Sequence, residues 1–107
     1  MVVWRRTLFC KTGQTAPVVN GCKELARIVM GADDTIKGYR VYTDLSGRTD
    51  RVITEIERDS LIHPRESSRK VHGNADAARI LREIGPMIQA AEVEFLDLEL
   101  SCSEHRP

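Results

Sequence analysis

Cysteine is scarce in this chain of 107 residues, and its spacing excludes the sites that cysteine usually builds. Cys10, Cys22 and Cys102 are odd in number, lie far apart and form no Cys-x-x-Cys pair. A disulfide framework and a zinc knuckle are therefore not predicted, and no metal site is indicated. Because free thiols are typical of a reducing compartment, we expect the protein to be cytoplasmic.

Long apolar runs are missing as well. No run approaches the roughly 18 apolar residues that a membrane-spanning helix needs. The N-terminal MVVWRRTLFC carries Arg5 and Arg6 inside its apolar stretch, whereas a signal peptide places its positive charges ahead of a longer apolar core. We expect neither a membrane span nor a secretory signal.

The chain has no excess of either charge, because 16 Lys and Arg residues balance 16 Asp and Glu residues. Binding to nucleic acid or to an anionic membrane needs a local excess of positive charge, so neither partner is predicted. The hydrophobic fraction of 41% and the charged fraction of 30% are those of a folded globular protein. At this length we expect one domain that spans residues 1–107.

Catalytic motifs are absent too. The sequence contains no Gly-rich phosphate loop, no Ser-centred nucleophile elbow and no His-Glu metal-binding helix. No cofactor is predicted from motifs, and the sequence alone leaves open whether the protein is an enzyme.

Residues 38–57, GYRVYTDLSGRTDRVITEIE, are the most informative stretch that is present. Apolar and polar residues alternate with a period of two on both sides of a Ser-Gly pair, which is typical of two half-buried strands. Gly47 can supply the positive φ that a tight reversal needs. We therefore predict a β-hairpin.

Residues 2–10 precede the hairpin and are rich in β-branched and aromatic residues, which favours a strand. One face of this strand is apolar except for Arg6. Those apolar residues are Val2, Trp4, Leu8 and Cys10.

Apolar spacings of three and four residues predict helices in two places. The first helix covers residues 16–30, with Thr15 as its N-cap. The second helical region begins at Pro64 and is interrupted at residues 73–74, where Asn74 caps a further segment that is stopped by Gly85 and Pro86. We therefore expect the second region to be split in two.

The last predicted strand, residues 89–100, is apolar on both faces. One face carries Ala91, Val93 and Phe95, and the other carries Leu96, Leu98 and Leu100. Helices can cover one face, but the other needs a second sheet, because a small monomer rarely leaves such a patch in water. We therefore expect a homodimer with Leu96, Leu98 and Leu100 in its interface.

The order β-α-β-β-α-β predicts an α+β, ferredoxin-like fold, with both helical regions on one face of a four-stranded antiparallel sheet. Four segments also carry a family likeness, namely 11–13 (KTG), 39–47 (YRVYTDLSG), 50–57 (DRVITEIE) and 91–95 (AEVEF). Through these segments the sequence resembles the dimeric α/β-barrel superfamily, and within it the NIPSNAP-like small bacterial domains.

This resemblance implies a homodimer in which two sheets face each other to form an α/β barrel with the helices outside. The superfamily includes cofactor-free monooxygenases, haem-degrading enzymes and lactone isomerases, so the likeness selects no single reaction. Some members carry a haem-ligating histidine in the second helical region, where this chain has His63 and His72. Favourable electrostatics at a helix end are the simpler interpretation of both residues.

A ligand pocket between the sheet and the helices is the main site hypothesis. Aromatic walls with a few polar groups suit a small apolar or aromatic ligand. The candidate residues are Trp4, Tyr39, Tyr42 and His72. A core or dimer contact is the alternative role for Trp4.

Four charged residues on neighbouring predicted strands form a second candidate cluster. They are Arg5, Arg40, Glu55 and Glu57. We expect cross-strand ion pairs among them. The alternative is a desolvated carboxylate without an arginine partner, which would serve as a base.

Two functional interpretations follow. The first is a homodimeric α/β-barrel domain that binds a small apolar or aromatic ligand between sheet and helices. The second is a small cofactor-free or haem-dependent monooxygenase or isomerase. Single-stranded RNA binding is disfavoured, because the RNA-recognition motif needs stacking aromatics where residues 51–56 have none.

Overall fold

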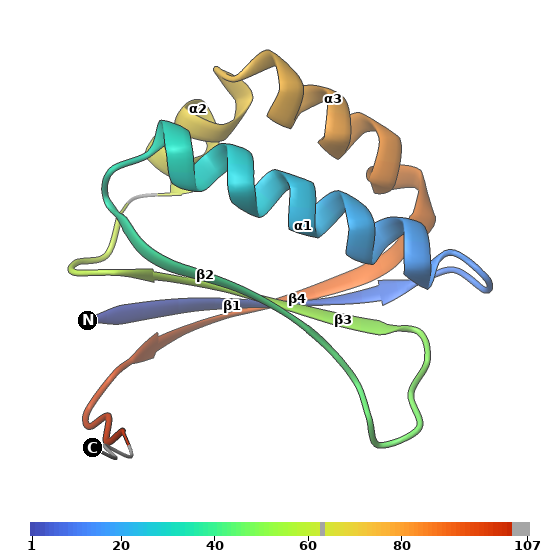
Figure 1. Ribbon diagram of the computed structural model, residues 1–107, viewed down its shortest axis with the longest axis horizontal. Coiled ribbons are helices and arrows are strands. Elements are labelled where there is room, and N and C mark those ends of the chain that lie inside the picture. Colours follow the sequence, from blue (N-terminus) through green and yellow to red (C-terminus); the bar gives the residue numbers. More distant parts are fainter. Residues whose placement is uncertain (63, 104–107) are drawn as a thin grey trace, which may run out of the picture.

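The computed structural model describes residues 1–62 and 64–103, and it has the β-α-β-β-α-β order of a ferredoxin-like fold (Figure 1). Its elements are β1 Val2–Cys10, α1 Thr15–Ala32, β2 Ile36–Thr43, β3 Arg51–Arg58, α2 Pro64–His72, α3 Ala75–Ile84 and β4 Ile88–Asp97, with a short 3-10 helix, Gly85–Met87, before β4. The second helical region is thus split in two, as the sequence predicts.

The four strands form one antiparallel sheet in the order β2-β3-β1-β4. All three α-helices lie on the same side of this sheet (Figure 1). The opposite side, which we call the open face, is covered by no helix in the part of the chain that the structure describes. The strands therefore present one face to the helices and one away from them.

The core lies between the sheet and the helices. Val52 on β3 and Ile80 on α3 are fully buried, and alternate residues of each strand point into this layer because side chains alternate along a strand. Gly21 lets α1 approach α3 closely, since a Cβ atom added there would lie 2.6 Å from Ile84 Cγ2. Helix packing thus depends on the missing side chain at Gly21.

The helix ends differ partly from the predicted ones. Thr15 is not the N-cap of α1 but its first residue, and its hydroxyl donates a hydrogen bond to the Thr49 carbonyl at 2.6 Å. This contact ties the start of α1 to the loop before β3. Asn74 caps α3 as predicted, because its side-chain oxygen accepts from the Ala77 N–H at 3.0 Å.

The hairpin of β2 and β3 is present, with Gly47 in its connection at a φ of 109°. The last strand is shorter than predicted. It ends at Asp97, so Leu98 and Leu100 lie beyond it, although the Leu98 N–H still donates to the Met1 carbonyl at 2.9 Å. Leu100 is 79% exposed.

Helices cover β4 less completely than expected. Phe95 and Val93 point to the helix side, because they pair with Trp4 and Arg6 of β1, yet each is 48% exposed. The helices pack mainly over β2 and β3. The edge strand β4 therefore keeps apolar residues uncovered on the helix side.

Within the described residues, each helix is too short or too polar to cross a membrane.

Candidate functional site

A cavity of about 240 Å³ lies between the sheet and the helices. The sheet contributes Trp4, Arg6, Tyr39, Thr54 and Ile56 to its lining. The helices contribute Leu25, Val29, Val71, His72 and Leu81. The cavity therefore has aromatic and aliphatic walls with few polar groups.

Three of the four residues that the sequence suggests for a pocket line this cavity, namely Trp4, Tyr39 and His72. Tyr42 does not. It is three residues beyond Tyr39 on β2, and an odd separation on a strand reverses the face. Its hydroxyl donates a hydrogen bond to Glu55 on the open face at 2.8 Å. His63, the other histidine considered, lies outside the described residues.

Trp4 forms part of the cavity wall. Its ring stacks on Phe95 of β4 with the centroids 5.7 Å apart and the planes at 21°. The indole Nε1–H is buried and has no hydrogen-bond partner among the described residues. Tryptophan N–H groups usually find a partner when they are buried, so this donor is an exception to that pattern.

Arg6 is the residue of this site that the pocket hypothesis missed. Among the described residues that line the cavity, it alone carries a permanent charge. Its Nε–H is buried and has no hydrogen-bond partner in the described part of the chain. The signal was visible in the sequence, because Arg6 is the one charged residue on the apolar face of β1.

Burial favours the neutral form of Tyr39, Cys22 and Cys10. Burial raises the pKa of Tyr39 to about 12 and the pKa of the Cys22 thiol to about 11, although the charge of Arg6 opposes both shifts. Burial also raises the pKa of the Cys10 thiol. Neither thiol is activated for nucleophilic chemistry, because the thiolate is the reactive form.

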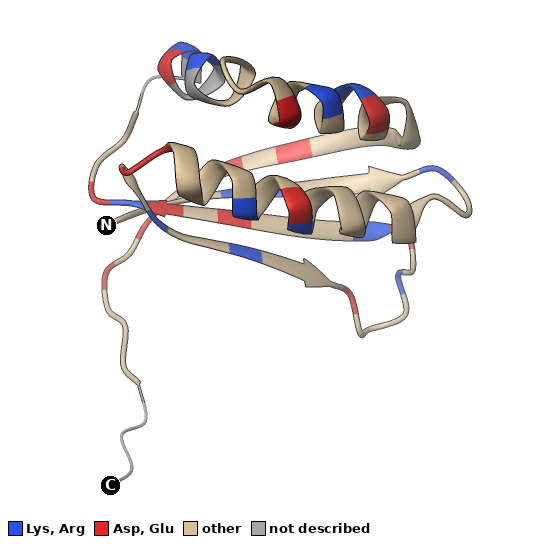
Figure 2. Ribbon diagram, turned by 45° about the horizontal axis from the view of Figure 1, so that its top comes forward, with Lys and Arg blue, Asp and Glu red and all other residues tan. Residues whose placement is uncertain are grey.

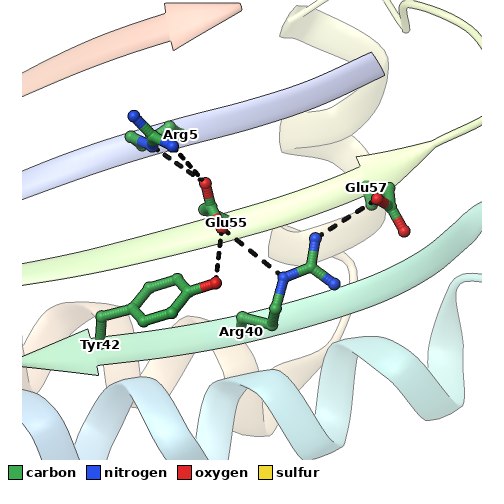
Figure 3. Close-up of polar contacts among 5 residues, drawn as sticks. All are labelled: Arg5, Arg40, Tyr42, Glu55 and Glu57. Carbon is green, nitrogen blue, oxygen red and sulfur yellow. Dashed lines mark hydrogen bonds and ion pairs between the residues drawn. The ribbon is translucent and has the colours of Figure 1, made fainter. Parts of the chain in front are cut away.

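The open face carries a network of paired charges around Glu55 (Figure 3). The carboxylate accepts from Arg5 Nε at 2.9 Å and lies 3.6 Å from Arg40 Nε, and Arg40 Nη2 lies 3.4 Å from Glu57 Oε1. The predicted cross-strand ion pairs are therefore present. They join β1, β3 and β2 on the face opposite the cavity.

Glu55 is not suited to act as a base near neutral pH. Burial alone would raise its pKa, but hydrogen bonds from Tyr42 and Arg5 and the charges of Arg5 and Arg40 outweigh that effect, so its pKa is lowered. A general base works best when its pKa is near the working pH. The alternative of an unpaired, desolvated carboxylate is therefore wrong for Glu55.

The lowered pKa of Glu55 predicts acid sensitivity. Because the carboxylate binds its proton more weakly in the folded chain than in the unfolded one, its stabilising effect is complete above the usual pKa of 4.5 and is lost as the pH falls through the folded-state pKa. Chemical denaturation between pH 3 and pH 7 measures this dependence. Glu55→Gln should be less stable at pH 7 and should lose stability less steeply below pH 4.5; an unchanged slope would contradict the role of this carboxylate.

No group of three or more His, Cys, Asp and Glu side chains that would hold a metal ion occurs within residues 1–62 and 64–103. Both acidic and basic residues lie along α1 and α3 (Figure 2). Arg79, for example, lies 3.2 Å from Glu24 and 3.0 Å from Glu83. The charges of these helices thus offset one another.

Comparison by sequence finds no matching protein family and no similar curated protein. Comparison by structure finds several similar folds. An uncharacterised NIPSNAP domain protein from Burkholderia xenovorans superposes with a TM-score of 0.73 at 18% identity, over 97% of this chain and 100% of the other. A NIPSNAP family protein from Agrobacterium tumefaciens gives 0.68 at 17%, over 89% and 82%.

An antibiotic biosynthesis monooxygenase superposes with a TM-score of 0.70 at 15% identity, over 91% of this chain and 97% of the other. At these identities the likeness concerns the fold. It extends over nearly the whole chain in each case. This chain therefore has the ferredoxin-like fold that is found in NIPSNAP domain proteins and in antibiotic biosynthesis monooxygenase.

Proposed function

We propose that the protein binds a small aromatic or apolar molecule in the cavity between its sheet and its helices. The proposal rests on one observation. Trp4, Tyr39 and aliphatic residues of α1 and α3 line the same cavity of about 240 Å³. Drug-sized ligands occupy pockets of roughly 300–1,000 Å³. The volume here suits a smaller molecule with one or two rings.

Trp4 provides a direct test, because it is the single tryptophan of the chain. Its indole N–H gives one resonance in a ¹H–¹⁵N spectrum, and that resonance reports on the cavity wall. Titration with one- and two-ring aromatic compounds, such as 2-naphthamide, should move it saturably, together with the amides of Leu25 and Tyr39. Shifts confined to the open face would contradict the proposal.

A second candidate function is oxygenation of the bound molecule. It is favoured by the fold shared with a protein named antibiotic biosynthesis monooxygenase, although a shared fold does not select a reaction. Oxygen consumption with quinol-type aromatic compounds, and a haemin titration followed at the Soret band, test the cofactor-free and the haem-dependent forms. If no oxygen is consumed and the Soret band of haemin does not change, oxygenation is contradicted and ligand binding without a reaction remains the proposed function.

We also propose that residues 1–107 form one domain of a homodimeric α/β barrel whose two sheets meet through their open faces. Leu96 lies on this face beside Val3, and Leu98 follows it with 38% of its surface exposed. The charges around Glu55 are mutually paired, so a second sheet can cover them without leaving an isolated buried charge. Leu100 extends the predicted interface beyond the end of β4.

Leu96→Arg should turn the dimer into a monomer, because it would bury an unpaired charge between the two sheets. Sedimentation at micromolar concentration measures the change. Met30→Arg is the matched control, since Met30 is an exposed residue of α1 on the helix side and should leave the dimer intact. A wild-type protein that sediments as a monomer would refute the dimer.

A further inference from the structure

Arg6 and its neighbour Arg5 differ sharply in their surroundings. Arg5 has Glu55 and Glu94 directly across from it on β3 and β4, and it forms an ion pair with Glu55 at 2.8 Å. Arg6 has Thr54 and Val93 in the same positions. The sheet therefore supplies acidic partners to the arginine on the open face and none to the arginine in the cavity.

The cavity itself supplies no acid either. Its described lining contains Arg6 and His72 as ionisable groups besides Tyr39, and no carboxylate. Arg6 is half-buried, and burial of its Nε–H is unfavourable unless a hydrogen-bond acceptor or an anion compensates it. The positive charge of Arg6 thus lacks a counter-charge among the described residues around it.

A second donor lies beside this charge. Trp4 and Arg6 are two residues apart on β1, so their side chains point the same way and their Cα atoms are about 7 Å apart. Trp4 Nε1 and Arg6 Nε are both buried without a hydrogen-bond partner among the described residues. The two residues that carry these unpaired donors, one of them charged, therefore line the same cavity.

We propose that the ligand is an aromatic carboxylate, whose carboxylate oxygens accept hydrogen bonds from Arg6 Nε and Trp4 Nε1. Its ring occupies the apolar part of the cavity formed by Leu25, Val29 and Leu81. This inference rests on the proposed binding function and adds the charge of the ligand to it. Arginine suits the role because its planar fork of donors matches a carboxylate.

Two probes of nearly equal shape test the charge, 2-naphthoate and the neutral 2-naphthamide. Isothermal titration at pH 7 should show that the wild-type protein binds the carboxylate at least about tenfold more tightly, as expected for hydrogen bonds to a charged group. Arg6→Gln should abolish this preference, because it removes the charge that distinguishes the two probes. Arg27→Gln, which removes one exposed charge from α1, should keep the preference.

The indole resonance of Trp4 gives a measurement that needs no variant. Saturation with 2-naphthoate should move the indole N–H resonance downfield more than 2-naphthamide does, because a charged acceptor forms the stronger hydrogen bond. Trp4→Phe should weaken 2-naphthoate binding several-fold and have less effect on the amide. These results decide the proposal even if Arg6→Gln does not fold.

The outcomes separate the two proposals. Equal affinity for both probes would overturn the carboxylate inference and leave the binding function in place. Binding of neither probe would overturn both. A preference for the carboxylate that persists in Arg6→Gln would show that the anion binds elsewhere, and would also overturn the inference.

Discussion

Val71→Phe is expected to weaken the binding of two-ring aromatic compounds at least tenfold. Val71 belongs to α2 and lines the cavity from the helix side, half-buried. A phenyl ring at this position would occupy part of a space of about 240 Å³, which leaves too little room for a naphthyl group. We expect the dissociation constant of 2-naphthamide to rise at least tenfold, which corresponds to about 1.4 kcal/mol, as measured by isothermal titration.

Met30→Phe is the matched control for this prediction. It adds the same ring at a residue of α1 that is 41% exposed and does not line the cavity. Both variants should keep the free energy of unfolding within about 1 kcal/mol of wild type, because Val71→Phe fills an existing space and Met30→Phe adds its ring at the surface. Unchanged affinity in a folded Val71→Phe protein would mean that the ligand binds outside the cavity.

Asp33→Ala is expected to cause a large loss of stability. Asp33 follows α1, its side chain is 1% exposed, and its carboxylate lies 3.4 Å from Nη2 of Arg58, whose side chain is 7% exposed. It also accepts hydrogen bonds from the Thr35 N–H at 3.0 Å and the Thr35 hydroxyl at 2.6 Å. Removing one partner of a buried ion pair costs about 3–5 kcal/mol, a large fraction of the stability of a small domain.

The exposed ion pair between Glu24 and Arg79 provides the control for Asp33. Its side chains are 53% and 44% exposed, so Glu24→Ala should change the free energy of unfolding by less than about 1 kcal/mol. Urea denaturation measures both variants. If Asp33→Ala were no more destabilising than Glu24→Ala, the junction of α1, β2 and β3 would not depend on the buried pair.

The fold was largely predictable because each element carries a strong local pattern. The alternation in residues 38–57 marks the hairpin, and Asn74 marks the start of α3. The limits of elements were less predictable, since they depend on contacts between distant segments. Thr15 is the first residue of α1, where its hydroxyl donates to the Thr49 carbonyl, and no local sequence pattern indicates that contact.

The candidate site was predictable in part. Trp4 lies on the predicted apolar face of the first strand and Tyr39 belongs to the predicted hairpin, and both line the cavity with His72. The aromatic ring of Tyr42 suggests a pocket role, but its place on β2 puts it on the opposite face. Arg6 is visible in the sequence as the one charged residue on an apolar face. Its lack of an acidic neighbour depends on the register of β1 with β3 and β4, which the sequence does not reveal.

A crystal structure of the protein soaked with 2-naphthoate tests the central claim most directly, because it locates the ligand. The account predicts naphthyl density in the cavity between Trp4 and Leu81, with the carboxylate within hydrogen-bond distance of Arg6 Nε. Density on the open face beside Glu55, or a cavity that stays empty at a saturating concentration of the compound, would contradict it.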